Sequence, residues 1–137
     1  MNSTNNRDGF AARAALTLTG IVGLGVVAQA VLAGAFYDGA HHSAVDVHKA
    51  LGPALIVPAV LAAIVCAARL RALPSGRRAF VAAAGTSVAL IIEAGLGFGA
   101  DHHSGLLLLH VPIALCLFAM LSRQITSLAG ITRSDRH

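Results

Sequence analysis

Two histidines recur at matching positions in a pattern that the chain carries twice. Residues 33–48 are AGAFYDGAHHSAVDVH, and residues 94–110 are AGLGFGADHHSGLLLLH. Each copy contains Ala-Gly, then His-His-Ser, then one further histidine at the start of an apolar run, His48 in the first copy and His110 in the second. The second copy has one extra residue between the triplet and the last histidine. Two imidazoles at one depth in an apolar bundle are the axial ligands that a haem iron needs, so the pair predicts bis-histidine ligation.

A second group of polar residues lies in the segments just before these histidines. It consists of His41, His42, His102 and His103, with Asp38 and Asp101 close by. Such a histidine rim is a candidate site for Zn²⁺ or Cu²⁺, because imidazole and carboxylate suit both ions. The same residues, with Lys49, could instead hydrogen-bond haem propionates. The third interpretation is a pair of plain polar loops at a membrane surface.

Glu93 is the one acidic residue within the third long apolar segment. A lone ionised carboxylate at such a depth is costly, so we expect Glu93 to be protonated or paired. One role is to accept the second ring N–H of an axial histidine, which would fix the ring and raise its basicity. A proton relay is another. The alternative without a functional role is a hydrogen bond to a neighbour such as Gln29.

The composition defines the class of protein. Of the 137 residues, 56% are apolar and only 12% are charged. A soluble domain of this length would need far more charge on its surface. The net charge of +4 does not indicate a nucleic-acid partner, because the basic residues stand at the ends of apolar segments. The partner that this pattern indicates is a lipid bilayer.

We therefore predict an all-α integral membrane protein, a single domain over 1–137 with four transmembrane helices. Helices are the form expected, since every backbone amide must be satisfied inside lipid. Two duplicated helical hairpins would form the bundle, the first over about 10–70 and the second over about 78–129. The four spans are expected at about 10–36, 44–70, 78–98 and 106–128. Pro53, Pro58 and Pro112 are expected to bend the second and fourth spans.

The distribution of arginine predicts the orientation. Nine of the ten cations lie at the two termini or around the middle connection, and Lys49 is the exception. The positive-inside rule then places both termini and the 69–79 loop in the cytoplasm, and both histidine-rich loops outside. We expect a multi-pass protein of the cell membrane, namely the inner (plasma) membrane of a bacterium.

Four spans with one histidine early in the second and another early in the fourth resemble one half of heme A synthase. That family has eight spans in two such halves, which bind b-type haem through paired histidines near the outer face. The resemblance covers the whole chain and implies that His48, in VDVHKALG, and His110, in LLLLHVPIA, are axial ligands. No cysteine pair stands in the outer loops, and Asp38 and Asp101 are the nearest match to the family's catalytic acidic residue. Small transmembrane cytochromes b show the same arrangement.

The sequence thus favours a membrane protein that binds haem b between His48 and His110, with Lys49 and Glu93 as further cofactor-binding residues. Its expected task is one-electron transfer or haem handling near the outer face, with a redox partner, a quinone or a second copy of the chain as candidate partners. The first alternative is a metal-dependent membrane oxidoreductase that uses the histidine rim and Cu or Zn. The second is a haem-free structural subunit. Enzymatic activity, as an oxidoreductase or of the heme A synthase type, stays open.

Overall fold

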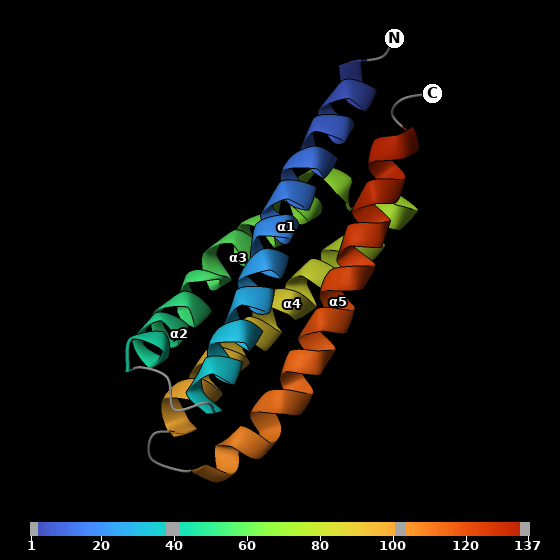
Figure 1. The fold of residues 1–137 in the computed structure, drawn as a ribbon. Helices are drawn as coiled ribbons and strands as arrows, with labels where there is room; N and C mark the ends of the chain where they lie inside the picture. Colours follow the sequence, from blue (N-terminus) through green and yellow to red (C-terminus); the bar gives the residue numbers. More distant parts are fainter. Residues whose placement is uncertain (1–2, 38–41, 101–103, 135–137) are drawn as a thin grey trace.

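The computed structural model describes residues 3–37, 42–100 and 104–134, and in these ranges the chain is almost entirely helical (Figure 1). The elements are α1 (Ser3–Tyr37), α2 (His42–Ala54), α3 (Ile56–Val65), the π-helical turn η1 (Cys66–Leu70), α4 (Pro74–Ala100), the 3₁₀ turn η2 (Ser104–Leu106) and α5 (Leu107–Ser134). No strand occurs in the part of the chain described. The predicted all-α class is confirmed. The helices extend beyond the predicted limits, since α1 begins at Ser3 and α5 ends at Ser134.

Four helical segments are long and apolar enough to cross a membrane. They are Arg7–Ala35, Ser43–Leu70, Pro74–Ala100 and Leu108–Arg133. Their lengths of 26 to 29 residues exceed the roughly 20 residues that a hydrocarbon core requires. Large apolar side chains such as Leu24, Val31 and Leu108 are exposed on the outside of the bundle, which suits contact with lipid. The chain is therefore a four-span membrane protein.

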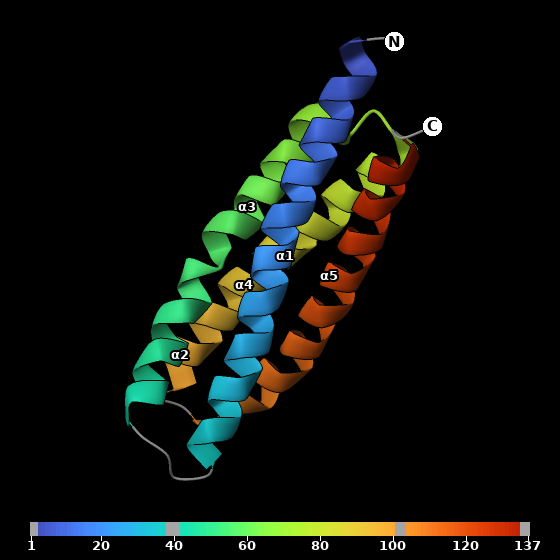
Figure 2. The same cartoon turned by 45° about the horizontal axis from the view of Figure 1, so that its top comes forward.

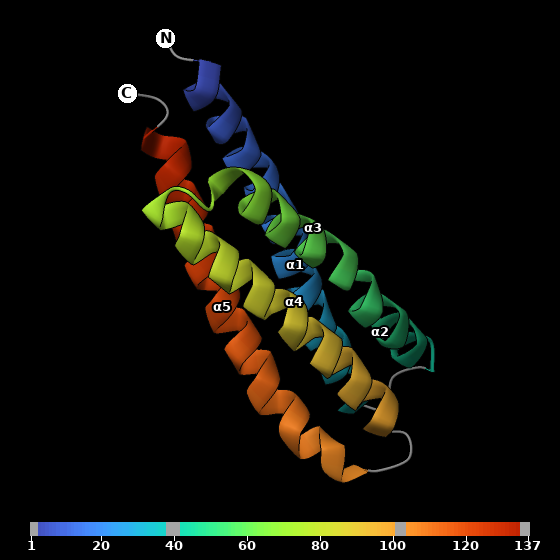
Figure 3. The same cartoon turned by 180° about the vertical axis from the view of Figure 1, so that it is seen from behind.

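The spans form a ring in the order α1, α2–α3, α4, α5. Helix α1 packs on α2, α3 and α5, and α4 packs on the same three helices from the other side, most extensively on α5. The views in Figures 2 and 3 show the four spans side by side along one long axis. The second and fourth spans thus face each other across a diagonal, as the up-down topology predicts.

The two ends of the bundle differ in charge. The termini and the turn from η1 to α4 lie at one end (Figure 1). We name this the arginine-rich end, because the bundle half next to it carries Arg7, Arg13, Arg69, Arg71, Arg77, Arg78, Arg123 and Arg133. We name the opposite end, where α2 and α5 begin, the histidine end.

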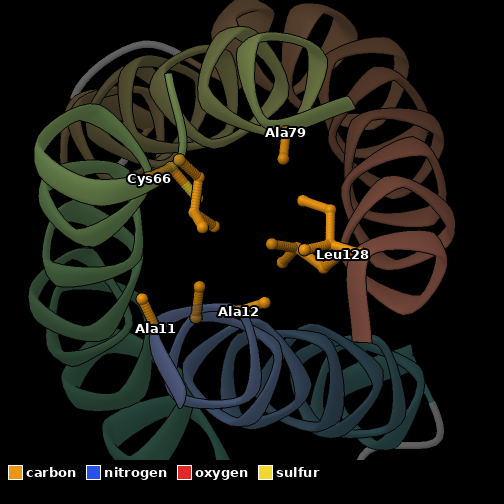
Figure 4. Close-up of a cluster of buried hydrophobic side chains, with 8 residues drawn as sticks. Ala11, Ala12, Cys66, Ala79 and Leu128 are labelled. Carbon is orange, nitrogen blue, oxygen red and sulfur yellow. The ribbon is translucent and has the colours of Figure 1, made fainter. Parts of the chain in front are cut away.

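Two apolar clusters fill the interior. The cluster nearer the arginine-rich end includes Ala12, Cys66, Ala79 and Leu128, which point toward one another in the end-on view of Figure 4. The other cluster, built around Val22, Leu90 and Leu117, lies nearer the histidine end. Alanine dominates the first cluster, and small side chains allow close approach of helices in a membrane.

A buried polar contact lies between these clusters. The Gln124 side-chain amide donates to the Thr19 hydroxyl at 2.7 Å, and that hydroxyl donates to the Ala15 carbonyl, also at 2.7 Å. Thr19 and Gln124 are almost fully buried. Because such interhelical hydrogen bonds have few competitors in lipid, this one ties α1 to α5 in the middle of the bundle.

The second span is interrupted at Leu55, between α2 and α3. Pro53 and Pro58 flank the interruption and remove the amide donors for the Lys49 and Ala54 carbonyls. The second span is thus interrupted where the sequence predicts a bend, and the bend itself stays a prediction. By contrast, α5 runs unbroken through Pro112, although this proline removes the amide donor for the Leu108 carbonyl.

Candidate functional site

His48 and His110 face each other across the bundle near the histidine end. His48 projects from α2 and His110 from α5, and their ring centres are 6.4 Å apart with an angle of 56° between the ring planes. Helices α2 and α5 do not pack extensively on each other, so the rings meet in the interior of the bundle. The extra residue in the second copy of the sequence pattern does not turn the two histidines apart.

Glu93 lies beside one of these rings. Its carboxylate oxygen Oε2 is in direct contact with Nδ1 of His110, and its side chain is only 9% exposed. When Nδ1 is held by a carboxylate, Nε2 is the ring nitrogen left to bind a ligand. Glu93 thus lies where its carboxylate can accept the Nδ1–H of His110, which is one of the roles that the sequence suggested.

Gln29 makes a different contact from the one weighed in the sequence analysis. Its side-chain amide Nε2 donates to the backbone carbonyl of His48 at 3.1 Å. The other side-chain atom, Oε1, is buried and has no hydrogen-bond partner within the described part of the chain. Gln29 therefore connects α1 to α2, the helix that carries His48. In the sequence, the one indication of such a contact is that Gln29 is a polar residue within an apolar span.

A cavity of about 300 Å³ adjoins the two rings and Glu93. All four spans contribute to its wall, and most of its lining side chains are apolar or small. The small ones are Gly52, Ala94, Gly97, Ala100 and Ala114. A methyl group added at Gly97 would meet no atom within 4 Å, so the space beside α4 is open. Lys49, the remaining residue expected to bind a cofactor, also lines this cavity.

The two imidazoles suit a metal whose other ligands come from a cofactor and not from the protein. Within the described ranges, no group of three or more His, Cys, Asp or Glu side chains is arranged to hold a bare metal ion. Two opposed imidazoles suit the iron of a porphyrin, which supplies four nitrogens itself. With metal–nitrogen bonds of about 2 Å and about 1 Å from nitrogen to ring centre, two rings flanking one metal have centres about 6 Å apart. The observed 6.4 Å agrees with this value.

The histidine rim lies almost wholly outside the described residues. This holds for His41, His102 and His103, and for Asp38 and Asp101. His42 is described only as the first residue of α2. A rim site for Cu or Zn therefore stays a prediction.

Comparison with known protein families, curated proteins and solved structures finds no match for this chain. The resemblance to half of heme A synthase and to small cytochromes b accordingly stays a prediction. What the fold defines is the class, an all-helical membrane protein with four spans and a buried carboxylate in contact with a partly exposed imidazole beside a cavity.

Proposed function

We propose that this chain binds one b-type haem between His48 and His110 and uses it for one-electron transfer or haem handling at the histidine end. The observation that carries the proposal is the 6.4 Å separation of the two imidazole rings across the bundle. Each ring comes from a different hairpin, so ligation would also tie the two halves of the chain together.

The protein's own residues have distinct tasks in this proposal. The imidazoles of His48 and His110 would hold the haem iron, and Glu93 would orient the His110 ring. The apolar wall, including Leu55, Leu90 and Leu117, keeps water away from the site. When bound, haem supplies the one-electron chemistry, and burial together with axial ligation adjusts its potential.

The buried ionisable groups favour this function over a haem-free structural role. Ionisable side chains within the membrane are costly, and they usually mark a functional site. His110 and Glu93 both lie within predicted spans and contact each other. A purely structural bundle would be more stable with apolar residues at these positions.

The test is the absorption spectrum of the purified protein and its variants. The wild type should show the sharp Soret and reduced α bands of six-coordinate low-spin haem. His48→Ala or His110→Ala should each abolish this spectrum or convert it to a five-coordinate high-spin form, because one axial ligand is lost.

A variant with His41, His42, His102 and His103 all replaced by Asn is the matched control. It removes four imidazoles from the same end of the bundle and should keep the low-spin spectrum. An unchanged spectrum in both single alanine variants would refute the proposed ligation. Stoichiometric Cu or Zn in the wild type, lost in the fourfold variant, would favour the metal-dependent oxidoreductase instead.

A further inference from the structure

A second hollow, of about 320 Å³, lies between α4 and α5 in the half of the bundle next to the arginine-rich end. Its lining consists of Arg78 from α4 and of Arg123, Thr126 and Ser127 from α5. No carboxylate takes part in this lining. The hollow is thus a positively charged recess, separate from the histidine site.

The two guanidinium groups have no acidic partner in the described ranges of the chain. The Glu93 carboxylate contacts His110 and belongs to the histidine site. Arg78 and Arg123 are both exposed on the surface of the bundle. Two like charges that converge on one recess repel each other, so an anion bound between them would relieve this repulsion.

The depth of Arg123 in the membrane is a further reason to expect a bound anion. The fourth span covers 26 residues, about 39 Å of helix, against about 30 Å of hydrocarbon. Arg123 lies ten residues before its last residue, Arg133, so its backbone is about 15 Å from that end. The helix is about 9 Å longer than the hydrocarbon is thick. Even if all of this extra length extended out of the membrane at the Arg133 end, the Arg123 backbone would lie about 6 Å inside the hydrocarbon. Its side chain must therefore extend toward the lipid headgroups.

The donors of the recess suit phosphate oxygens. Each guanidinium presents a planar fork of N–H groups that matches phosphate. The Ser127 hydroxyl is a further donor that lines the recess. The Thr126 hydroxyl already donates to the Arg123 carbonyl at 2.9 Å, so it stabilises the helix turn instead.

We propose that this recess binds the phosphate group of an anionic membrane lipid. The place of the recess, between two membrane-spanning helices in the half of the bundle next to the arginine-rich end, favours lipid over free phosphate. Basic pockets between transmembrane helices are a known mode of binding for anionic headgroups. The proposal does not depend on haem, because the recess and the histidine site share no residue.

The experiment measures thermal unfolding of the full chain in phosphatidylcholine micelles titrated with phosphatidylglycerol. The midpoint of the stabilisation gives an apparent lipid affinity for the wild type, for Arg78→Gln/Arg123→Gln and for the control Arg71→Gln/Arg133→Gln. The control removes the same charge from the same end but leaves the recess intact. We expect the recess variant to bind about 25-fold more weakly, about fivefold per guanidinium, and the control to change by about twofold or less.

Arg78→Lys and Arg123→Lys cover the case in which the double variant does not fold. They keep the charge but lose the fork, so each should still weaken binding severalfold. Equal affinities of the recess variant and the control, or unchanged affinities of both lysine variants, would overturn the proposal. A shift of the same size with inorganic phosphate in pure phosphatidylcholine would also overturn it, because it would assign the recess to free phosphate.

Discussion

The two candidate ligands are not equivalent at the residue scale. The Glu93 carboxylate contacts the His110 ring, whereas His48 accepts a hydrogen bond from Gln29 of α1 through its backbone carbonyl. A carboxylate on the far nitrogen makes an imidazole a stronger donor toward a metal. Under the proposed function, His110 is therefore the ligand that favours the oxidised iron more strongly.

The first prediction at this scale concerns Glu93→Gln. The substitution keeps the size of the side chain and an oxygen acceptor but removes the charge. The haem should stay bound, and its midpoint potential should rise by about 59 mV for each tenfold loss of preference for the oxidised iron. Because the carboxylate favours the oxidised iron, we expect a rise on the order of 59 mV in a redox titration of the Glu93→Gln protein.

Asp46→Asn is the control for this prediction. Asp46 is exposed on α2 near the same end, and it does not line the cavity. Its removal should leave the potential nearly unchanged, because solvent screens an exposed charge. A rise of equal size in both variants would show that total charge, and not contact with His110, sets the potential.

The sequence predicted the chemistry of this site better than its packing. The recurring histidines and the isolated Glu93 could be recognised because ionisable residues stand out within apolar spans. The hydrogen bond from Gln29 to the His48 carbonyl could not be predicted, since it depends on the rotation of α1 against α2. The cavity likewise results from four helices at once.

At the scale of elements, the interruption at Leu55 is matched by a glycine on the neighbouring helix. A methyl group added at Gly25 of α1 would overlap the Leu55 side chain. At Gly23, one half-turn earlier on the same helix, an added methyl group would meet no atom within 4 Å. The glycine at position 25 therefore permits the contact between α1 and the interrupted second span.

This contrast gives the second prediction, which compares Gly25→Ala with Gly23→Ala. Overpacking against Leu55 should destabilise the first variant by about 1–3 kcal/mol, reduced by up to about 1 kcal/mol from the better helix propensity of alanine. The second variant should be neutral or slightly more stable, because only the propensity changes. Denaturant unfolding in detergent measures both, and equal stabilities would show that Leu55 moves aside without cost.

The prolines show where prediction of elements succeeds and where it stops. Pro53 and Pro58 lie in the interior of the second span, and the span is interrupted between them. Pro112 has the same chemistry and also lies inside a helix, yet α5 continues through it. The presence of a proline in an apolar span therefore does not by itself predict an interruption, and exact helix starts cannot be read from the sequence.

For the whole molecule, the distribution of arginine along the sequence agrees with the topology of the fold. The ring of four spans brings both termini and the turn from η1 to α4 to one end, and this is the end with the arginines (Figure 1). Apolar length alone was enough to predict the four spans, because each exceeds what a bilayer needs. The side of the membrane on which each end lies is set by how the chain is inserted, and the positive-inside rule predicts it.

The last prediction tests this orientation in intact cells. Cys66 and Cys116, the two cysteines of the chain, are first replaced by alanine. Single cysteines are then placed at Ser43, at the start of α2, or at Ala72, between η1 and α4. A membrane-impermeant maleimide should label the cysteine at position 43. Lys49 is the one lysine or arginine near the histidine end, so the positive-inside rule predicts that this end faces outward. The cysteine at position 72 should react only after the cells are opened, since Ala72 is exposed and stands among the arginines. Labelling at 72 but not at 43 in intact cells would reverse the orientation and place the candidate haem site at the cytoplasmic face.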